Sequence, residues 1–401
     1  MVFSASSLNR RQALACCLAL AGTAACGCAA TAERPAPGAV PRQSRQVFAD
    51  ELRRSLRAAG GSRRPVVAVL AHNAGTEITD FLVPHAVLAR SGVARVQAVA
   101  LRRGPVALLP ALRVEVPCGL DDFDRQHPQG ADCVVVPAMQ VDDDPALLDW
   151  VRRQSAQGAA IVGVCSGARV LGRAGLLDGR GFTGHWADRR TLQARHPTAR
   201  HVPGQRYLAD RGVVTTTGVS ASVPVSLALV EALGGTAAAQ ALAQQVGAAS
   251  FGPEHPSEAF GLSARRVAVY LANQARGWAG GRMAVGIGDG ADDIGLALAM
   301  DAWSRTHRLA GLTVQAVAGR PVEPPLRLAS GLRVLLPPRP EGTPWPALPL
   351  YADARPAQVL DAALCDIGRR YGAGTRDWVA LEMEHHPLDG VGGCAEPGAG
   401  S

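Results

Sequence analysis

The chain has 401 residues, 47% hydrophobic and 19% charged, and this balance is typical of a globular protein of about two domains. The sequence contains no lysine, and its net charge of +7 is spread along the chain rather than gathered in a basic stripe with interleaved aromatic residues. This charge pattern, together with the lack of a C-terminal helix-turn-helix pattern, argues against nucleic-acid binding.

The N-terminus has the pattern of an export signal. Arg10-Arg11 precede an apolar run over 13–25, which is too short to span a membrane and resembles the hydrophobic part of a twin-arginine signal. An A-x-A cleavage site ends at Ala32, so we expect residues 1–32 to be removed and the mature protein to be exported and periplasmic. The alternative is lipidation at Cys26, which would tether the protein to a membrane.

Export would place the protein where disulfides form. An odd number of cysteines follows the expected cleavage site, which leaves at least one free thiol or an intermolecular link. These cysteines are Cys118, Cys133, Cys165, Cys365 and Cys394. The sequence has no CxxC pair and no Cys/His zinc spacing, and we expect neither a metal site nor a cofactor.

Residues 33–64 are expected to form a linker that contains a short amphipathic helix over 47–59. From residue 65, fully apolar runs alternate with helical patterns that end at Gly, Pro or Asp. This alternation predicts an α/β domain in which helices cover both faces of a parallel sheet. The expected strands are 65–70, 94–101, 132–137, 159–164 and 213–217; the expected helices are 78–91, 145–157, one ending at 171, and 223–233; a hairpin is expected over 108–116.

The most informative segment is Ile161–Ala168, an apolar run that ends in Gly-x-Cys-x-Gly. It predicts a buried strand that turns sharply into a helix, with Cys165 at the corner and Gly163 and Gly167 where side chains would crowd the turn. Such a nucleophile elbow places the cysteine at the carboxyl end of a strand, where ligands bind in parallel sheets. The adjacent helix N-terminus favours the thiolate, which is the reactive form.

The C-terminal half contains a weak internal repeat. Residues 251–281 are expected to be a linker, and Met283–Ile287 then mirrors 67–71 at an offset of 283 − 67 = 216. Similar elements follow in the same order, but without a Gly-x-Cys-x-Gly segment. We therefore expect 282–386 to be a second, degenerate copy of the domain and 387–401 to be a disordered tail.

Six segments carry a resemblance to a known family: Asp80–Pro84, Asp132–Pro137, Gly163–Ala168, Leu171–Arg180, Thr183–Trp186 and Val214–Gly218. Together they resemble the ThiJ/PfpI family within the class I glutamine amidotransferase-like superfamily. The resemblance covers about 65–250 and is closest to the branch of isocyanide hydratases and the amidotransferase-like halves of AraC-type regulators. It implies a flavodoxin-like parallel sheet sandwiched by helices.

The resemblance also implies three site residues. Cys165 matches the family nucleophile, and Asp80 matches the acidic residue that contacts it and moves a proton to or from the substrate. His185 matches a family histidine, which is either a general base or a residue lining the sheet edge too far away for proton transfer. In the second copy, Leu296 stands in the place of Asp80, so we expect that copy to be non-catalytic.

Backbone amides are the expected stabilisers of a developing oxyanion. The N–H of Ser166 is the first expected donor, and the Ala138–Met139 loop is expected to supply the second. In the family this loop is usually Pro-Gly-Gly, so the bulkier residues here are expected to narrow the pocket or change the amide geometry. Glu77 lies in the same loop region as Asp80 and is a candidate to line the pocket.

Two functions remain open from the sequence. In the first, the protein is a cysteine-dependent hydratase or hydrolase of a small molecule: Cys165 attacks an electrophilic carbon and water resolves the adduct. In the second, it is a non-catalytic ligand-binding or redox-sensing protein that uses the same cysteine. A third interpretation is an interaction module in which the two domains simply pack together, with the degenerate copy in place of the partner in a family homodimer.

Overall fold

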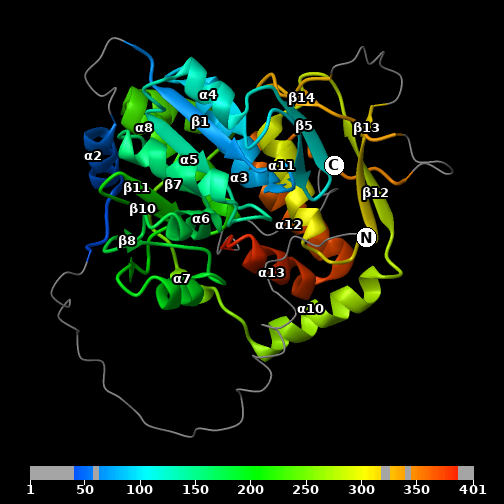
Figure 1. Cartoon of the computed structure of the whole chain (residues 1–401). Coiled ribbons are helices and arrows are strands. Elements are labelled where there is room, and N and C mark those ends of the chain that lie inside the picture. Colours follow the sequence, from blue (N-terminus) through cyan, green and yellow to red (C-terminus); the bar gives the residue numbers. More distant parts are fainter. Residues whose placement is uncertain (1–39, 57–62, 318–325, 339–344, 387–401) are drawn as a thin grey trace, which may run out of the picture.

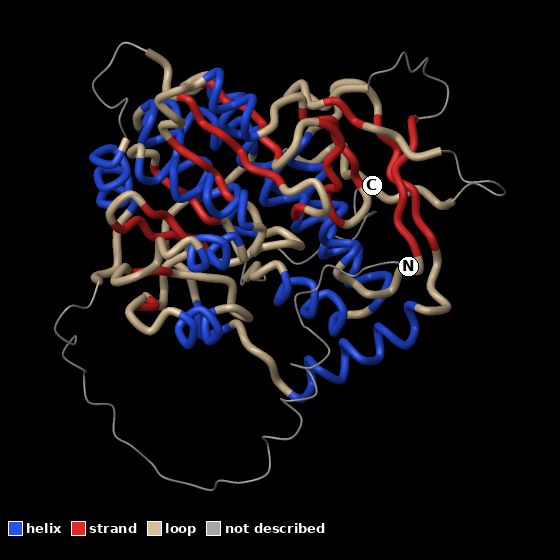
Figure 2. The backbone as a smooth tube through the Cα atoms, viewed as in Figure 1, coloured by secondary structure: helices blue, strands red, loops and turns tan. Residues whose placement is uncertain are grey.

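The computed structural model describes residues 40–56, 63–317, 326–338 and 345–386. Its largest element is a six-stranded sheet in the order β10-β11-β7-β6-β1-β3 (Figure 1 and Figure 2). The strands of this sheet are β1 (Val66–Ala71), β3 (Arg95–Ala100), β6 (Cys133–Val136), β7 (Ala160–Gly163), β10 (Tyr207–Asp210) and β11 (Val213–Thr216).

Five of the six strands run parallel to one another. Counted along the chain, their order is 2-1-3-4-5, which is the order of the flavodoxin-like fold. β1, β6, β7 and β11 are completely buried apolar or threonine-containing runs, as expected for strands covered on both faces. The predicted fold class of the first domain is therefore confirmed.

Helices cover both faces of this sheet. Val69 and Val135 face α2, α3 and α8, whereas Leu70 and Val134 face α4, α5 and α6, because successive strand residues point to opposite sides. The helices of the first domain are α2 (Arg45–Ser55), α3 (Ile78–Ser91), α4 (Leu120–Gln126), α5 (Pro145–Ala156), α6 (Gly167–Arg173), α7 (Arg189–Arg195), α8 (Ser222–Gly234) and α9 (Thr236–Val246).

The edge strand β10 was not predicted. It runs antiparallel to β11 and is joined to it by Arg211 and Gly212, which both have positive φ, at 49° and 77°. Two central residues with positive φ are typical of a tight hairpin turn. The four residues of β10 are too few to show a strand period, and Arg211 does not signal such a turn as Asn or Asp would.

The segment expected to be a linker, 33–64, contains α2, and this helix belongs to the core of the first domain. Phe48 is fully buried, and its ring contacts Tyr207 edge to face with 4.6 Å between centroids. Leu52 is also buried in the same cluster. The apolar stripe of this short amphipathic helix packs against the rest of the first domain. The prediction of a linker is therefore wrong for α2.

Smaller sheets complete the domain. The predicted hairpin is longer than expected, because β4 begins at Gly104, and it extends to a strand from the C-terminal half. The four-stranded sheet has the order β14-β5-β4-β2, formed by β2 (Thr76–Glu77), β4 (Gly104–Leu109), β5 (Leu112–Val116) and β14 (Arg333–Val334), and a two-stranded sheet joins β8 (Gly181–Phe182) to β9 (Arg200–His201).

The C-terminal half also starts with a strand–helix–strand unit. β12 (Arg282–Ile287) and β13 (Gly311–Ala316) pair in parallel, and α11 (Asp293–Ser304) connects them. Among the described residues this sheet has only two strands, so a full second copy of the domain is not confirmed. Three further helices belong to this half: α10 (Ala264–Gly277), α12 (Val359–Tyr371) and α13 (Ala373–Glu382).

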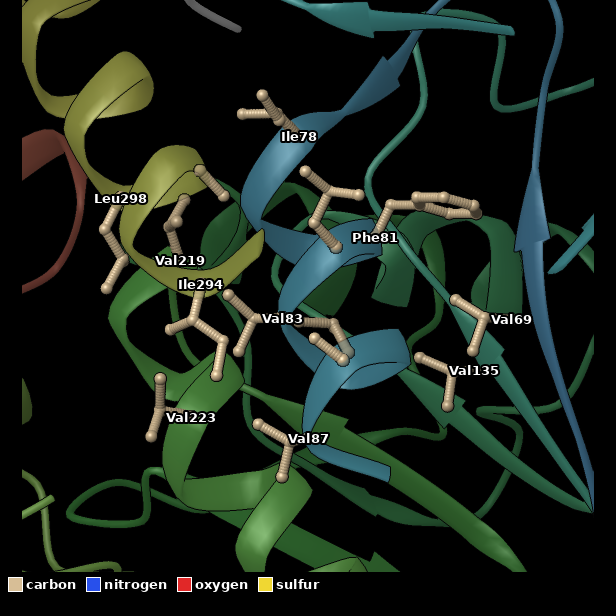
Figure 3. Packing of buried hydrophobic residues seen from close by; sticks show 14 of the residues in the cluster. Val69, Ile78, Phe81, Val83, Val87, Val135, Val219, Val223, Ile294 and Leu298 are labelled. Carbon is tan, nitrogen blue, oxygen red and sulfur yellow. The ribbon is translucent and has the colours of Figure 1, made fainter. Parts of the chain in front are cut away.

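The two halves share one hydrophobic core. Ile294 and Leu298 of α11 lie in the same buried cluster as Val83 and Val87 of α3, and Figure 3 shows these side chains with Val223 of α8. Arg90 of α3 also forms an ion pair with Asp292 at the start of α11. The halves are therefore packed together along α3 and α11 rather than held by a linker alone.

Three predictions concern residues outside the described ranges. They are the export signal with its cleavage site, the alternative lipidation site Cys26, and the disordered tail. None of the described helices is long and apolar enough to cross a bilayer. Cys118, Cys133 and Cys165 are free thiols.

Candidate functional site

The corner between β7 and α6 has the geometry of a nucleophile elbow. Cys165 has a φ of 53°, in the left-handed region that a non-glycine residue adopts only at a local backbone cost. Its N–H donates to Thr216 Oγ1 at 2.9 Å, which fixes the corner against β11. A Cβ on Gly167 would lie 2.0 Å from the carbonyl oxygen of Val136, so the close approach requires glycine. The predicted elbow and its crowded glycine are confirmed.

Three strand ends converge at this corner. Asp80 and Glu77 follow β1, Ala138 follows β6 and Cys165 follows β7, all at the carboxyl edge of the sheet. The strand order reverses between β1 and β6. Ligands of open α/β sheets bind outside the carboxyl ends of strands at such a switch point. The fold therefore brings together the residues that the sequence predicted for one site.

Asp80 and Glu77 are buried carboxyl groups at the start of α3. Glu77 caps the helix by accepting the N–H of Asp80 at 2.6 Å, and Asp80 accepts the N–H of Ala138 at 3.1 Å and the hydroxyl of Ser222 at 3.2 Å. Burial raises the pKa of Asp80 to about 7, although the hydrogen bond from Ala138 acts in the opposite direction. Burial, with Asp301 and Asp80 nearby, raises the pKa of Glu77 well above its ordinary value.

The C-terminal half supplies an ion pair to these carboxyl groups. Arg305 lies just after α11, and its Nε is 2.7 Å from Asp301 Oδ1. Its Nη2 lies 3.6 Å from Glu77 Oε1, and Thr79 Oγ1 donates to Asp301 Oδ2 at 3.3 Å. Burial alone would lower the pKa of the Arg305 guanidinium, but the acidic groups around it, Asp301 and Glu77 first, together raise the pKa above its ordinary value, so the group stays charged. Arg305 is the cation that partly balances the acidic groups at the start of α3.

The thiol of Cys165 is not activated in the way that the sequence predicted. Burial, followed by the negative charges of Asp80 and Glu77, raises the pKa of Cys165 well above its ordinary value. α6 has only seven residues, and its N-terminus does not outweigh these effects. The prediction that the helix dipole yields a low-pKa thiolate is therefore wrong for the resting site. The sulfur instead starts as a neutral thiol, 4.0 Å from Ser166 Oγ.

The predicted oxyanion donors differ in their availability. The N–H of Ala138 is bonded to Asp80, and its carbonyl oxygen accepts the N–H of Glu77 at 2.9 Å. Met139 lies beside Ala138 and forms an antiparallel bridge to Thr76. The Ala138 amide therefore positions Asp80 rather than an oxyanion. The N–H of Ser166, one residue after Cys165, stays the predicted donor, while its hydroxyl donates to Asp188 at 2.5 Å.

His185 is held by the C-terminal half. Its Nε2 lies 3.1 Å from the carbonyl oxygen of Glu382, so this nitrogen carries the proton, and its buried Nδ1 has no hydrogen-bond partner among the described residues. Burial lowers the pKa of His185, which favours the neutral ring. Among the described residues no hydrogen bond joins His185 to Cys165. Its role as a base stays a prediction.

Glu384 is a buried acid just after α13. Its Oε2 accepts the N–H of Gly218 at 2.7 Å and the N–H of Trp186 at 3.1 Å. Burial raises the pKa of Glu384 to about 8. A Cβ on Gly218 would lie 2.6 Å from that of Glu384, so the glycine makes room for the acid. The segment just after α13 thus binds the loop that contains Trp186 and the loop that contains Gly218, which flank the elbow.

Neither Arg305 nor Glu384 had a sequence signal that placed it at the site. Asp301 and Arg305 are four residues apart, a spacing typical of an ion pair on an exposed helix face. Only the packing of α11 on α3 brings them to Glu77. Among the described residues, no group of three or more His, Cys, Asp or Glu side chains has the arrangement of a metal site.

Part of the chain is similar in sequence to a known family and to known proteins. The model of the DJ-1/PfpI family matches residues 65–232. Isonitrile hydratase from Pseudomonas putida is 36% identical over 105 residues, which are 26% of this chain and 44% of that protein. The HTH-type transcriptional regulator GlxA from Rhizobium meliloti is 36% identical over 132 residues, covering 29% of this chain and 40% of the regulator. The chain thus spans less than half the length of these curated relatives.

Among solved structures, a ThiJ/PfpI family protein from Pseudomonas syringae is similar, with a TM-score of 0.43 and 24% sequence identity. The similarity covers 53% of this chain and 84% of that protein. DJ-1beta from Drosophila melanogaster has a TM-score of 0.42 and 19% identity, covering 47% of this chain and 100% of that protein. From the family match and from its own strand order and elbow, this chain carries a DJ-1/PfpI family domain over residues 65–232.

Proposed function

We propose that the protein is a cysteine-dependent hydratase or hydrolase of a small molecule, with an isonitrile as the first substrate to test. The observation that carries the proposal is the strained corner of Cys165 beside Asp80, a buried carboxyl group whose pKa lies at about 7. The similarity to isonitrile hydratase supports the choice of substrate, although it covers only part of each protein.

The proposed chemistry starts from the neutral thiol. As the sulfur of Cys165 forms a bond to the terminal carbon of R–N≡C, its proton passes to the Asp80 carboxylate. Asp80 returns that proton to the same carbon, which gives a thioimidate, R–N=CH–S–Cys. Water then adds to this carbon, the C–S bond breaks, and the sulfur regains a proton as R–NH–CHO leaves. One water is consumed, and no electrons are exchanged.

Asp80 suits the proton transfer because both its forms are populated near neutral pH. The hydrogen bonds from Ala138 and Ser222 hold its carboxyl group in one orientation, so little reorganisation is needed when the proton moves. Because the thiol pKa is raised, the proton must leave during the attack rather than before it. The same feature counts against the redox-sensing alternative, since oxidation proceeds through the thiolate.

The test is the conversion of alkyl and aryl isonitriles to formamides, followed by mass spectrometry with the wild type, Cys165→Ser and Cys118→Ser. Cys118 is also a buried free thiol, and it serves as the matched control. We expect product with the wild type and the control and none with Cys165→Ser. Equal turnover by Cys165→Ser would contradict cysteine catalysis, and no turnover by the wild type would reject isonitriles as substrates.

We also propose that the protein is exported and works in the periplasm. The support is Arg10-Arg11 before the apolar run over 13–25. The N-terminal residue of protein recovered from the periplasm tests this, with Glu33 expected after cleavage at Ala32. An acylated Cys26 would instead indicate the lipid-anchored alternative, and an uncleaved chain in the cytoplasm would contradict export.

We further propose that the C-terminal half takes the place of a partner subunit. The packing of α11 on α3 and the contact of α13 with both loops beside the elbow support this. Light scattering on the purified protein should give the mass of a monomer. A stable dimer would contradict the proposal.

A further inference from the structure

Helix α10 exposes apolar side chains on the face that points away from the protein. Its outward residues, spaced three or four apart, are Ala264, Ala268, Leu271, Ala275 and Trp278. Leu271 is 57% exposed and Trp278 is 87% exposed. A surface helix of a globular protein normally has polar residues on its outer face. In Figure 1 this helix lies at the outer edge of the molecule.

The opposite face of α10 is held firmly against the protein, so the helix cannot rotate its apolar stripe inward. Tyr270 stacks at a tilt on Trp378 of α13, with 4.9 Å between ring centroids. Gln274 Nε2 lies 3.2 Å from the Nδ1 of His307. A Cβ on Gly277 would lie 2.2 Å from the carbonyl oxygen of His307, which shows how closely the helix backbone approaches its neighbour.

The charged side chains of helix α10 itself are all positive. The sequence over 259–288 contains four arginines and no aspartate or glutamate. Arg265 and Arg276 are exposed and, at 100° per residue, both lie on the same flank of the outward stripe. Arg266 is instead turned to the carbonyl oxygen of Gly261 at 2.6 Å. A partner that fits this face must therefore combine apolar and anionic chemistry.

We propose that α10 is a docking surface for an anionic lipid bilayer, on which it lies flat. Leucine and tryptophan would enter the interface between headgroups and acyl chains, while Arg265 and Arg276 would contact the lipid phosphates. A 14-residue helix is about 21 Å long and buries too little area alone for a stable dimer, for which about 1,200–2,000 Å² is typical. Two copies of α10 would also bring arginines together without an acidic partner.

The test uses the full-length chain with vesicles of phosphatidylglycerol or phosphatidylcholine that contain brominated lipid, which quenches tryptophan in the interface. Trp278→Phe keeps the face apolar and serves as the spectroscopic blank, so the difference between wild type and variant isolates Trp278. We expect this difference signal to be quenched and blue-shifted with phosphatidylglycerol vesicles. The comparison also removes any contribution of other parts of the chain to vesicle binding.

Two sets of variants test the apolar contact and the arginine contact with the bilayer separately. Leu271→Ser with Trp278→Ser should abolish the α10-dependent binding. Val47→Ser changes an exposed residue of α2, a helix that lies far from α10 in Figure 1, and should bind like the wild type. Arg265→Gln with Arg276→Gln should weaken binding roughly 25-fold, because each arginine near an anionic surface contributes a factor of about five to the affinity. All replaced side chains are exposed, and circular dichroism checks that each variant folds.

Three results would overturn the proposal. The first is a Trp278 signal that phosphatidylglycerol vesicles leave unchanged. The second is binding that the arginine replacements do not weaken. The third is a protein dimer, formed without lipid, that Leu271→Ser with Trp278→Ser dissociates, because α10 would then bind a second copy of the chain.

Discussion

Two strand–helix–strand units in this chain have the same order of elements but different continuations. β1–α3–β3 continues into β6, β7 and β11. The end of β6 brings Ala138 to Asp80 of α3, and the end of β11 brings Thr216 to Cys165 after β7. β12–α11–β13 forms a sheet of two strands among the described residues, and no elbow follows it there. A strand–helix–strand unit therefore becomes a site only where further strand ends supply the groups that complete it.

The helices of the two units differ most at one position. Asp80 in α3 is buried with hydrogen bonds from Ala138 and Ser222, whereas Leu296, at the offset of 216 in α11, is buried in the hydrophobic core. The candidate site therefore belongs to the first unit. The second unit contributes Arg305, a cation that lies 3.6 Å from the buried Glu77 of the first unit.

The largest expected effect is on catalysis and compares carboxyl groups in the two helices. Asp80→Asn should lower turnover of the isonitrile about 10²–10⁴-fold, because it removes the proton carrier. Asp293→Asn changes a buried carboxyl group at the start of α11 and should leave turnover near the wild-type value. Steady-state rates of formamide formation measure both. Equal losses would mean that folding, and not proton transfer, explains the effect.

The next effect tests how the second unit supports the first. Arg305→Met should lower the free energy of unfolding by about 3–5 kcal/mol, because Glu77 and Asp301 are left buried without their cation. Arg369→Met removes an exposed ion pair with Asp366 and should cost about 1 kcal/mol or less. Urea unfolding compares the two. If Arg305→Met lowers the free energy of unfolding no more than Arg369→Met does, Arg305 does not stabilise the buried acids.

A smaller effect compares a crowded glycine at the elbow with an open one in the second unit. Gly167→Ala places a Cβ 2.0 Å from a backbone carbonyl oxygen and should destabilise the protein by about 1–3 kcal/mol. Gly288→Ala, just after β12, meets nothing within 4 Å and should be close to neutral. Thermal unfolding of both variants measures the two changes in stability. A neutral Gly167→Ala would show that the elbow is less crowded than described.

The last comparison concerns pH and the contact of the segment after α13 with the first unit. The folded pKa of Glu384, about 8, exceeds its ordinary value of 4.5, so stability present at low pH is lost as pH rises toward about 8. Glu384→Gln cannot ionise, so its Tm advantage over the wild type should grow from pH 5 to about 8 and then level off. Glu258→Gln, on the surface, should follow the wild type. Parallel profiles of Tm against pH for Glu384→Gln and the wild type would contradict a raised pKa of Glu384.

Much of the first domain was predictable because its local signals agree with one another. β1, β6 and β7 are short apolar runs, α5 starts after Asp144, whose carboxylate accepts the N–H of Ala146, and α3 ends at Gly92 in the left-handed conformation. The elbow was predictable for the same reason, since its two glycines mark a turn that side chains would block.

The rest depends on contacts between distant segments, which leave no periodic pattern in the sequence. The docking of α11 on α3, and with it Arg305, arises from residues more than 200 positions apart. The thiol pKa of Cys165 was predicted in the wrong direction, because the helix N-terminus is visible in the sequence whereas the burial of the thiol is not. Glu384 was missed for the same reason as Arg305.

The most direct test of the site is the pH dependence of Cys165 alkylation, measured by mass spectrometry on the wild type and Asp80→Asn. We expect a wild-type thiol pKa above its ordinary value and a lower one in Asp80→Asn, because a neighbouring negative charge is removed. The same variant should have lost turnover. A wild-type thiol pKa below about 8.5, or one that Asp80→Asn leaves unchanged, would contradict the coupling of Cys165 to Asp80.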